Sequence, residues 1–384
     1  MFEITNTPLG YSWGSKNLMA EFRGTVPTGA PEAELWFGDH DSSPAVRVDD
    51  GRSMVEWQRQ SRHPAFPFLV KILAVEQPLS LQVHPPKSCA ESGFAKEQRE
   101  RIPADAPHRN FKDRNHKPEA MIAISEFRAY VGFSSADVYR PILARLEQLG
   151  VSGIGALTTL PRDSAWPFHS TEGVAHLTEL SAALRRGIPG LTDDSTTDRA
   201  IARAIDIARR FPDDPSTALT LVLNYCVLAP GEVIFVPAGT IHSYLSGLGL
   251  EIMATSDNVL RAGMTTKHVD VPALLEALSM DSTNNPFLDP QTVDHESLFQ
   301  PPVEDFGFAI VEVDGPRDYA IDGPAIVVAI DGDVTFAGKH TLSLRRGSAA
   351  VIERGESVSQ VFGNGKFVVV TAPARRGWLS WLRR

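Results

Sequence analysis

The chain has 384 residues, 42% of them hydrophobic, and a formal net charge of −10. A chain of this length buries a large core and is expected to form roughly two or three domains, or one large β architecture with an insertion. No apolar run approaches the ~18 residues of a membrane helix. Residues 1–5 lack the basic and apolar segments of a signal peptide. The negative charge disfavours nucleic acid as a partner.

The two cysteines and the C-terminal tail bear on the compartment. Cys89 and Cys226 lie far apart in the sequence and form no CxxC pair, so we expect a reducing cytoplasm and no disulfide framework. The last ten residues, 375–384, are basic and contain tryptophan. Such a segment is compatible with contact to a membrane surface or nucleic acid. An ordinary chain terminus is the simpler interpretation.

The first region, residues 1 to about 134, is predicted to be mostly β. Short apolar runs alternate with Gly, Pro and Asp turns, as in residues 34–38 followed by residues 39–44. A helix is predicted over residues 53–60, and a charged helix and loop over residues 87–114. The strongest strand candidates are residues 68–73 and 118–124, which are rich in apolar and β-branched side chains.

From residue 135 the hydrophobic period changes to that of helices. Residues 136–146, 174–186 and 197–211 have apolar stripes at helical spacing, which are most simply core faces opposite a solvated charged face. We interpret residues 135–216 as an inserted helical domain.

The β pattern returns at residue 217, with predicted strands at residues 220–228 and 233–236. A helix is predicted over residues 271–278. Beyond residue 300, further predicted strands at 326–330, 351–352 and 367–370 are separated by turns at 331–333 and 346–347. Many short strands with frequent turns are typical of a jelly roll or barrel.

The predicted fold class is therefore mainly β with a helical insertion. The run from Pro230 to His242, among so many short strands, is similar to a cupin-type barrel. We expect cupin-type jelly-roll β-barrel domains plus an α-helical domain. The first barrel would comprise residues 1–134 and 217–299, and residues 300–384 would form a C-terminal, cupin-like β domain without ligands.

One predicted strand, ending at Pro85, carries three polar side chains. Side chains alternate along a strand, so Ser80, Gln82 and His84 should share one face. Unpaired polar groups are costly to bury. The sequence therefore predicts that something polar lies against this face.

Gln82, His84, Glu119 and His242 are the candidate metal ligands. Two histidines and a carboxylate are a normal zinc set that leaves a position for water or substrate. A glutamine ligand is unusual, and spacing alone does not bring the four together. For any single histidine among the eleven in the chain, an ordinary surface or core role is the better expectation.

Two further segments carry charged groups. Lys117 and Glu119 should share a strand face, either as an ordinary ion pair or as a ligand beside a charge that tunes its pKa. Residues 251–268 form either a solvated loop or a substrate loop. In the second case the guanidinium group of Arg261 would donate hydrogen bonds to a phosphate or to a developing oxyanion, with Asp257 and Lys267 near it.

The order of several motifs carries a family resemblance. The chain resembles the class I phosphomannose isomerases, also called mannose-6-phosphate isomerases. Any single motif would be a weak signal, whereas their order along most of the chain is specific. The motifs are Tyr11-Ser12-Trp13-Gly14, Glu34-Leu35-Trp36-Phe37-Gly38, Ser80-Leu81-Gln82-Val83-His84-Pro85, His116-Lys117-Pro118-Glu119, Pro237-Ala238-Gly239-Thr240-Ile241-His242-Ser243-Tyr244 and Ser256-Asp257-Asn258-Val259-Leu260-Arg261-Ala262-Gly263.

The resemblance implies the fold, the metal and the site. It implies a cupin-type catalytic domain, one Zn²⁺ per chain and Arg261 as a residue needed for catalysis. Ile241 and Ala262 depart from the residues common in the family, but neither is at a ligand position. The implied ligands are Gln82, His84, Glu119 and His242, and the implied pocket residues are Lys117, Glu251, Tyr244, Asp257, Ser80, Lys71 and Lys267.

The implied reaction interconverts mannose 6-phosphate and fructose 6-phosphate by moving a proton between C1 and C2 through a cis-enediol(ate). Zinc would act as a Lewis acid. The base stays open among Glu251, Asp257, Lys117 and His84, with Glu251 or Asp257 preferred and Lys117 assisting. The phosphate is expected at Ser80, Lys71 or Lys117.

Two other functions remain as alternatives. A cupin metal oxygenase would use iron with more histidine ligands, and a sugar-binding cupin would have lost activity. We expect a cytoplasmic monomer with a phosphosugar substrate and neither nucleic acid nor a membrane as partner. Such an enzyme would serve mannose catabolism or the supply of GDP-mannose.

Overall fold

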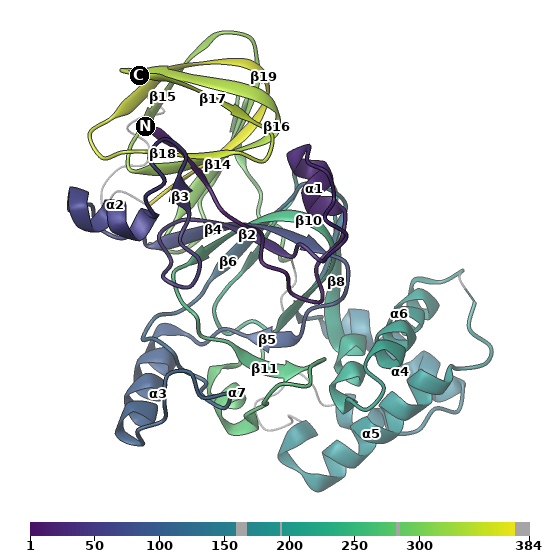
Figure 1. Cartoon of the computed structure of the whole chain (residues 1–384). Coiled ribbons are helices and arrows are strands. Elements are labelled where there is room, and N and C mark those ends of the chain that lie inside the picture. Colours follow the sequence, from purple (N-terminus) through teal and green to yellow (C-terminus); the bar gives the residue numbers. More distant parts are fainter. Residues whose placement is uncertain (159–166, 193, 282–284, 373–384) are drawn as a thin grey trace.

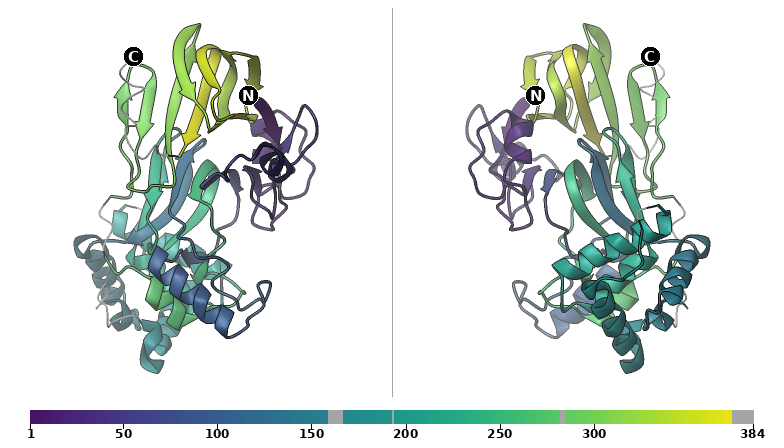
Figure 2. Two further views of the ribbon diagram at one scale, coloured as in Figure 1. Left: turned by 90° about the vertical axis from the view of Figure 1, so that its left-hand side faces the viewer. Right: turned by 90° about the vertical axis from the view of Figure 1, so that its right-hand side faces the viewer.

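Two antiparallel sheets and a group of helices build the molecule (Figure 1). The computed structural model describes residues 1–158, 167–192, 194–281 and 285–372. The chain is mainly β, as predicted. The sheets follow one another along the length of the molecule, and helices α3 to α7 lie beyond the first sheet, at the end away from the second (Figures 1 and 2).

The first sheet has nine strands, and its central path runs β11-β5-β10-β4-β2. Strand β6 joins β10 to β9, and β7 joins β10 to β8. The strands are β2 (Glu34–Phe37), β4 (Phe68–Val75), β5 (Leu81–Val83), β6 (Glu119–Ala123), β7 (Phe127–Phe133), β8 (Leu223–Leu228), β9 (Val233–Val236), β10 (His242–Ala254) and β11 (Leu260–Gly263).

Alternation along these strands separates an apolar face from a polar one. In β4, Val70 and Ile72 pack in the apolar layer between the two sheets. Lys71, the residue between Val70 and Ile72 in the sequence, points to the opposite face of the strand. In β10, Leu250 and Ile252 face the same apolar layer, which places Glu251 on the face of Lys71. Lys71 and Glu251 are direct cross-strand partners.

Strand β10 bends in its middle and so joins two groups of strands. Its first half pairs with β5 and β7, and its second half with β4 and β6. The register shifts between Tyr244 and Ser246, and Gly247 has a φ of 119°. A Cβ at Gly247 would lie 2.4 Å from the carbonyl oxygen of Glu126, so only glycine fits at this bend.

The second sheet has ten strands in the order β12-β13-β14-β19-β16-β18-β1-β3, with β15 on β19 and β17 on β16. Val327 and Val369 pack inside this sheet, while Val328 and Val368 face the layer shared with the first sheet. The strands are β1 (Phe2–Thr5), β3 (Val46–Arg47), β12 (Gln291–Val293), β13 (Glu296–Phe299), β14 (Gly307–Asp314), β15 (Arg317–Asp322), β16 (Ala325–Gly338), β17 (Thr341–Arg345), β18 (Ala349–Ile352) and β19 (Ser357–Thr371).

Strand pairing bears on the expected domain limits. Strands β1 and β3 come from the N-terminal region, and β12 and β13 precede residue 300, yet all four belong to the second sheet. The boundaries 1–134 with 217–299, 135–216 and 300–384 stay predictions.

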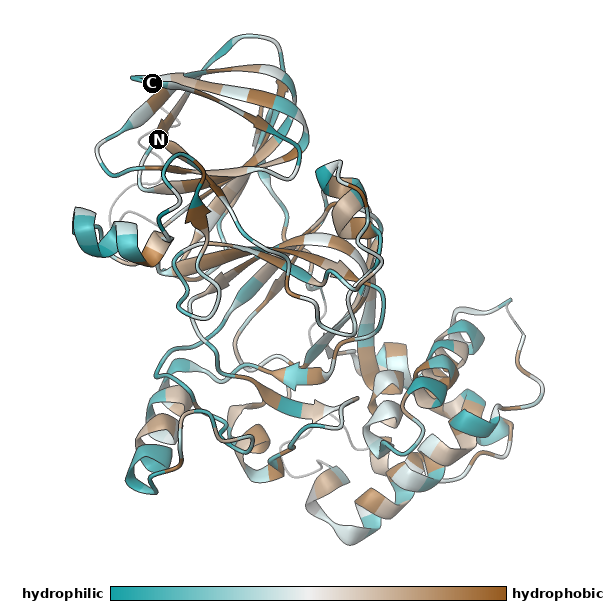
Figure 3. Cartoon of the chain, in the orientation of Figure 1, coloured by the Kyte–Doolittle hydropathy of each residue, from teal (hydrophilic) through white to brown (hydrophobic). Residues whose placement is uncertain are grey.

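The helices follow local sequence signals. In α2, Ser53 and Glu56 form a reciprocal capping box at the N-terminus. Figure 3 shows largely hydrophobic strands in both sheets and helices that contain both hydrophobic and hydrophilic residues. The helices are α1 (Leu18–Arg23), α2 (Met54–Ser61), α3 (Lys87–Arg99), α4 (Ala136–Gln148), α5 (Thr171–Arg186), α6 (Thr196–Arg210) and α7 (Val271–Ala277), with 3₁₀ turns η1 (Ile154–Leu157), η2 (Pro167–His169) and η3 (Pro215–Val222).

Two element predictions were wrong in detail. Residues 220–222, predicted as strand, instead form the end of the 3₁₀ segment η3. At the N-terminus of η3, the side chain of Asp214 accepts a hydrogen bond from the amide of Ser216. Residues 331–333, predicted as a turn, continue strand β16 after a register shift between Ala329 and Asp331, and Gly332 stays paired with Gly365 at a positive φ of 56°.

Over the part of the chain that the structure describes, no helix is both long and apolar enough to cross a membrane. The basic segment 375–384 lies outside the described residues.

Candidate active site and metal centre

A cleft of about 590 Å³ lies over the polar face of the first sheet. The predicted site residues line it, except His84 and His242, which are buried beneath its wall at 1% and 0% exposure. The lining residues among them are Gln82, Glu119, Lys117, Glu251, Asp257, Arg261, Ser80, Lys71, Tyr244 and Lys267.

Three of the predicted ligands meet at one point in the floor of the cleft. Glu119 begins β6, His242 begins β10, and His84 follows directly after β5. One ligand atom from each lies within 4.8 Å of the others. His84 Nε2 is 3.0 Å from Glu119 Oε1, and His242 Nε2 is 3.5 Å from Glu119 Oε2.

Backbone carbonyls fix which nitrogen of each imidazole faces this point. His84 Nδ1 lies 2.8 Å from the carbonyl oxygen of Asn258, and His242 Nδ1 lies 2.9 Å from that of Thr240. Only a protonated Nδ1 makes these bonds, so both Nε2 atoms carry lone pairs in the neutral rings.

A cation fits this donor set. His84 Nε2 and Glu119 Oε1 are both buried, and neither has a hydrogen-bond partner. Two lone-pair atoms at contact distance repel one another, and burying His84 Nε2 without a partner is costly. A metal ion between them would remove both penalties. Two imidazole nitrogens and a carboxylate are the donors that zinc prefers.

Gln82 is the fourth predicted ligand and lies beside the other three. It pairs with His242 on one side and with Arg261 on the other. Its Nε2 lies 3.3 Å from His242 Nε2, which suits an amide donating to the imidazole lone pair. Half a turn of the amide group would present its oxygen instead.

Glu119 is the electrostatic centre of the floor. Lys117 Nζ lies 2.8 Å from Glu119 Oε1 and forms an ion pair with it, although the angles of this contact do not fit a hydrogen bond. The Tyr244 hydroxyl donates a hydrogen bond to Glu119 Oε2 at 3.1 Å. Burial alone would raise the pKa of Glu119, but the charge of Lys117 holds it well below its usual range. Burial and the charge of Lys117 lower the pKa of His84 to about 4, so its imidazole is neutral.

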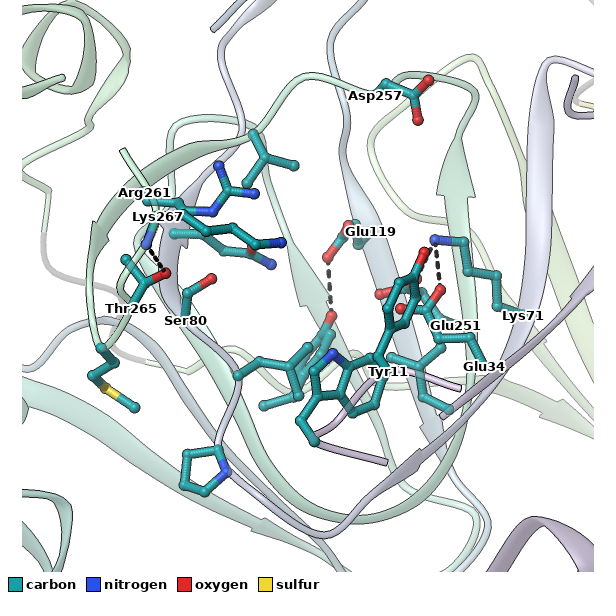
Figure 4. A pocket seen from close by; sticks show the side chains of 18 of the residues that line it. Tyr11, Glu34, Lys71, Ser80, Glu119, Glu251, Asp257, Arg261, Thr265 and Lys267 are labelled. Carbon is teal, nitrogen blue, oxygen red and sulfur yellow. Dashed lines mark hydrogen bonds and ion pairs between the residues drawn. The ribbon is translucent and has the colours of Figure 1, made fainter. Parts of the chain in front are cut away.

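A second buried cluster lies at one end of the cleft, around Glu251 (Figure 4). Lys71 Nζ lies 3.6 Å from Glu251 Oε2 and 3.5 Å from Glu34 Oε2, and it sits over the ring of Trp36. Burial, and then the negative charge of Glu119, raise the pKa of Glu251 to about 7. Burial alone would lower the pKa of Lys71, but Glu34 and Glu251 hold it above its usual range.

The opposite end of the cleft is cationic. Figure 4 shows Arg261, Lys267 and Ser80 on one side of Glu119, and Lys71, Glu251, Glu34 and Tyr11 on the other. Among the described residues, no carboxylate forms an ion pair with Arg261 or Lys267. Burial lowers the pKa of Arg261. Burial and the charge of Arg261 lower that of Lys267. This end of the cleft therefore favours an anion.

Asp257 lies at the rim rather than in either cluster. Its carboxylate is 3.3 Å from His40 Nε2, its side chain is 40% exposed, and the hydrogen bond from His40 lowers its pKa. Of the two carboxylates preferred as the base, Glu251 is therefore the buried one whose pKa is raised.

Several residues that line the cleft had no predicted role. Glu34, Trp36 and Tyr11 appeared only within motifs, and His40 and Arg210 were not singled out. Glu34 and Trp36 are two apart, and Trp36 Nε1 donates to Glu34 at 2.6 Å. A carboxylate two residues from a tryptophan in an apolar strand was the signal that could have found them.

Comparisons with known proteins agree on one family. A sequence model of the phosphomannose isomerase type I catalytic domain matches residues 1–136. The chain is 34% identical to the mannose-6-phosphate isomerase of Escherichia coli (strain K12), over 96% of this chain and 99% of that protein. It is 28% identical to the Homo sapiens protein of the same name, over 94% and 95% of the two chains.

Solved structures give the same result. A crystal structure of a phosphomannose isomerase variant from Salmonella typhimurium has 30% identity and a TM-score of 0.86, covering 97% of this chain and 100% of that one. A mannose 6-phosphate isomerase bound with zinc and yttrium has 30% identity and a TM-score of 0.83, with the same coverage. The chain belongs to the phosphomannose isomerase family.

Proposed function

We propose that this chain interconverts mannose 6-phosphate and fructose 6-phosphate by proton transfer between C1 and C2, with one Zn²⁺ in the floor of the cleft. The observation that carries the proposal is the convergence of the His84 and His242 lone pairs on the carboxylate of Glu119. This buried point lies between a cationic end and a buried carboxylate, which matches a substrate with a phosphate at one end and a carbon acid at the other.

His84, Glu119 and His242, with Gln82 as a fourth ligand, would hold the ion. Its zinc-bound relative supports this choice of metal. Bound there, zinc would supply Lewis-acid stabilisation of the negative charge that develops on the sugar oxygens. The carbonyls of Asn258 and Thr240 would keep both imidazoles in the ligating tautomer.

The phosphate would bind at the cationic end. Arg261 is the residue suited to grip two phosphate oxygens at once. Lys267 adds a second charge, and the hydroxyl of Ser80 adds a hydrogen bond. Lys71, one of the expected phosphate contacts, suits this role poorly, because Glu34 and Glu251 already neutralise it at the other end. Lys117 is likewise paired with Glu119.

Glu251 would be the general base. A carboxylate with a pKa near 7 is half ionised at neutral pH, and it can both accept and return a proton. It would take the proton from C2 of the aldose and deliver it to C1. Lys71, 3.6 Å away, would stabilise its ionised form. Lys117 would add positive charge near the sugar oxygens, and Asp257 would contact the substrate only at the rim.

The finer features of the fold belong to the same proposal. We assign the first sheet to a catalytic cupin-type jelly roll interrupted by the helical insertion, and the second sheet to a cupin-like C-terminal domain. We propose a monomer that acts in the cytoplasm, where its free cysteines, Cys89 and Cys226, would stay reduced.

The test combines metal analysis with a coupled assay on purified protein. We expect about one zinc per chain, activity on mannose 6-phosphate, and loss of activity with a chelator that added Zn²⁺ reverses. Bound iron with oxygen consumption and no isomerisation would instead indicate an oxygenase. Sugar phosphate binding without turnover in the zinc-loaded protein would indicate a binding protein.

A further inference from the structure

The segment after β11 carries the cationic end of the cleft in an unusual backbone conformation. Arg261 lies in β11, and Lys267 ends the bend at residues 264–267, which we call the Met264 turn. Both residues line the cleft together with Met264. Met264 is 2% exposed and has a φ of 53°, in the left-handed region that a residue with a Cβ rarely adopts. Such a conformation persists only where its surroundings impose it.

The carboxylate of Asp214 makes the contacts that impose this conformation. Its Oδ2 accepts hydrogen bonds from the amides of Met264 at 2.5 Å and Thr265 at 3.4 Å. Ser216 Oγ lies 3.2 Å from the same Met264 amide. Hydrogen bonds to an ionised carboxylate are stronger than those between neutral groups.

Close packing supports the same contact. Gly263 has a φ of 150°, and a Cβ there would lie 1.6 Å from Ser216 Oγ. The turn is therefore pressed against Ser216 and Asp214, with no room for a side chain between them.

Asp214 is itself anchored in the helical region. Its other carboxylate oxygen accepts from the Ser216 amide at 2.9 Å at the start of η3. Its carbonyl oxygen accepts from Ser181 of α5 at 3.1 Å and from Thr217 at 2.9 Å. The contact thus ties the helical segment, residues 135–216, to the turn at the cationic end of the cleft.

We infer that Asp214 is a positioning residue for substrate phosphate: it holds the Met264 turn, and through it sets Arg261 and Lys267 against the cleft. The inference rests on the proposed phosphate end. The helical segment would therefore contribute to substrate affinity without supplying the base or a metal ligand.

The test is Asp214→Asn, compared with Asp213→Asn. The introduced side-chain amide would turn a donor towards backbone N–H groups that need an acceptor. Asp213 is the matched control, because it is exposed and, among the described residues, pairs only with Arg185, at 3.6 Å on the surface. Both substitutions remove one negative charge.

We expect Asp214→Asn to raise the KM for mannose 6-phosphate roughly 10-fold to 100-fold, the range for losing a charged hydrogen-bond acceptor. Turnover number should change by no more than about threefold, since the base and metal are untouched. Inorganic phosphate, a competitive probe of the cationic end alone, should lose affinity in parallel. Zinc content should equal that of the unaltered protein and of Asp213→Asn.

Ser216→Ala tests the same contact more gently and decides the question if Asp214→Asn does not fold. It removes one of the two acceptors at the Met264 amide, so we expect about a threefold rise in KM and in the phosphate inhibition constant.

The inference is overturned if Asp214→Asn matches Asp213→Asn in KM and phosphate inhibition. It is also overturned if turnover number or zinc content falls instead of phosphate affinity. If Asp214→Asn does not fold, an unchanged KM in Ser216→Ala overturns it. The proposed function fails differently, when the unaltered protein neither turns over mannose 6-phosphate nor is inhibited by phosphate.

Discussion

In both sheets, side chains alternate between the shared apolar layer and the opposite face, but the two sheets carry different residues on that opposite face. Each turns one set of apolar side chains towards the shared layer, as Val70 and Val328 do. The opposite face of the second sheet packs apolar residues such as Phe367 and Phe336. The opposite face of the first sheet also packs apolar residues such as Leu73 and Met121, but beside them it carries Lys71, Glu119 and other buried charges.

Buried charge is satisfied in different ways in the two sheets. In the second sheet one buried carboxylate, Glu296, is satisfied locally by the hydroxyl of Tyr319 at 2.7 Å. In the floor of the first sheet, Glu119 Oε1 and His84 Nε2 have no hydrogen-bond partner. Unsatisfied buried groups destabilise a fold unless a ligand compensates for them. The proposed metal would therefore stabilise the first sheet, whereas the second sheet supplies its own partner for Glu296.

Removing the central carboxylate of the first sheet should have the largest effect. Glu119→Ala should weaken zinc binding and activity by more than the ~100-fold that loss of an outer partner of a metal ligand costs. Metal analysis after dialysis and the coupled assay measure this. Glu296→Gln in the second sheet is the control, and it should keep both. A Glu119→Ala protein that retains metal and turnover would contradict the metal site.

Glu251→Gln separates the base from the metal. We expect turnover to fall by roughly 10²-fold to 10⁴-fold, the range for general acid–base catalysis, with zinc retained. In the unaltered enzyme the base works when deprotonated, so kcat/KM should rise with pH and level off above about 7. Substantial turnover in Glu251→Gln with the same rise would assign the base elsewhere, with Asp257→Asn as the next variant.

Phe367→Ala tests whether the core of the second sheet stabilises the fold. Phe367 is fully buried against Phe336 and Tyr319, so its truncation should cost about 3–5 kcal/mol of unfolding free energy. Denaturant unfolding measures the loss. Zinc content and kcat at low temperature should be unchanged, and a parallel loss of zinc would show that the two sheets are not independent.

Among the four variants that compare the two sheets, the smallest effect is expected for Ser80→Ala. Loss of one hydroxyl contact should raise the KM for mannose 6-phosphate about 5-fold to 10-fold and leave zinc in place. Ser343→Ala, on an exposed strand position of the second sheet, is the control. Loss of metal from Ser80→Ala would place Ser80 with the ligands and not with the phosphate.

Much of this arrangement was predictable because strand periodicity is local. The alternation of side chains along a strand was enough to predict that Ser80, Gln82 and His84 share one face and that Lys117 lies beside Glu119. The helices at residues 136–146, 174–186 and 197–211 followed from their apolar stripes, and α4, α5 and α6 confirm them.

The rest depended on contacts between distant segments. The carbonyl of Asn258 that orients His84 comes from 174 residues away. The pairing of Lys71 with Glu34 and Glu251 is set by sheet order, which periodicity does not encode. Asp214 had no predicted role, because its partners are backbone amides of another segment.

The bent strand β10 has a consequence for how the enzyme is made. It carries His242, Tyr244 and Glu251, and it is the strand on which β4, β5, β6 and β7 assemble. The partner of Gln82, His242, is synthesised 160 residues later. During synthesis on the ribosome the earlier strands lack their central neighbour until residue 254 has emerged. A nascent chain released before that point would expose the apolar edges of β4 and β6, and one released before residue 242 would also lack a proposed metal ligand.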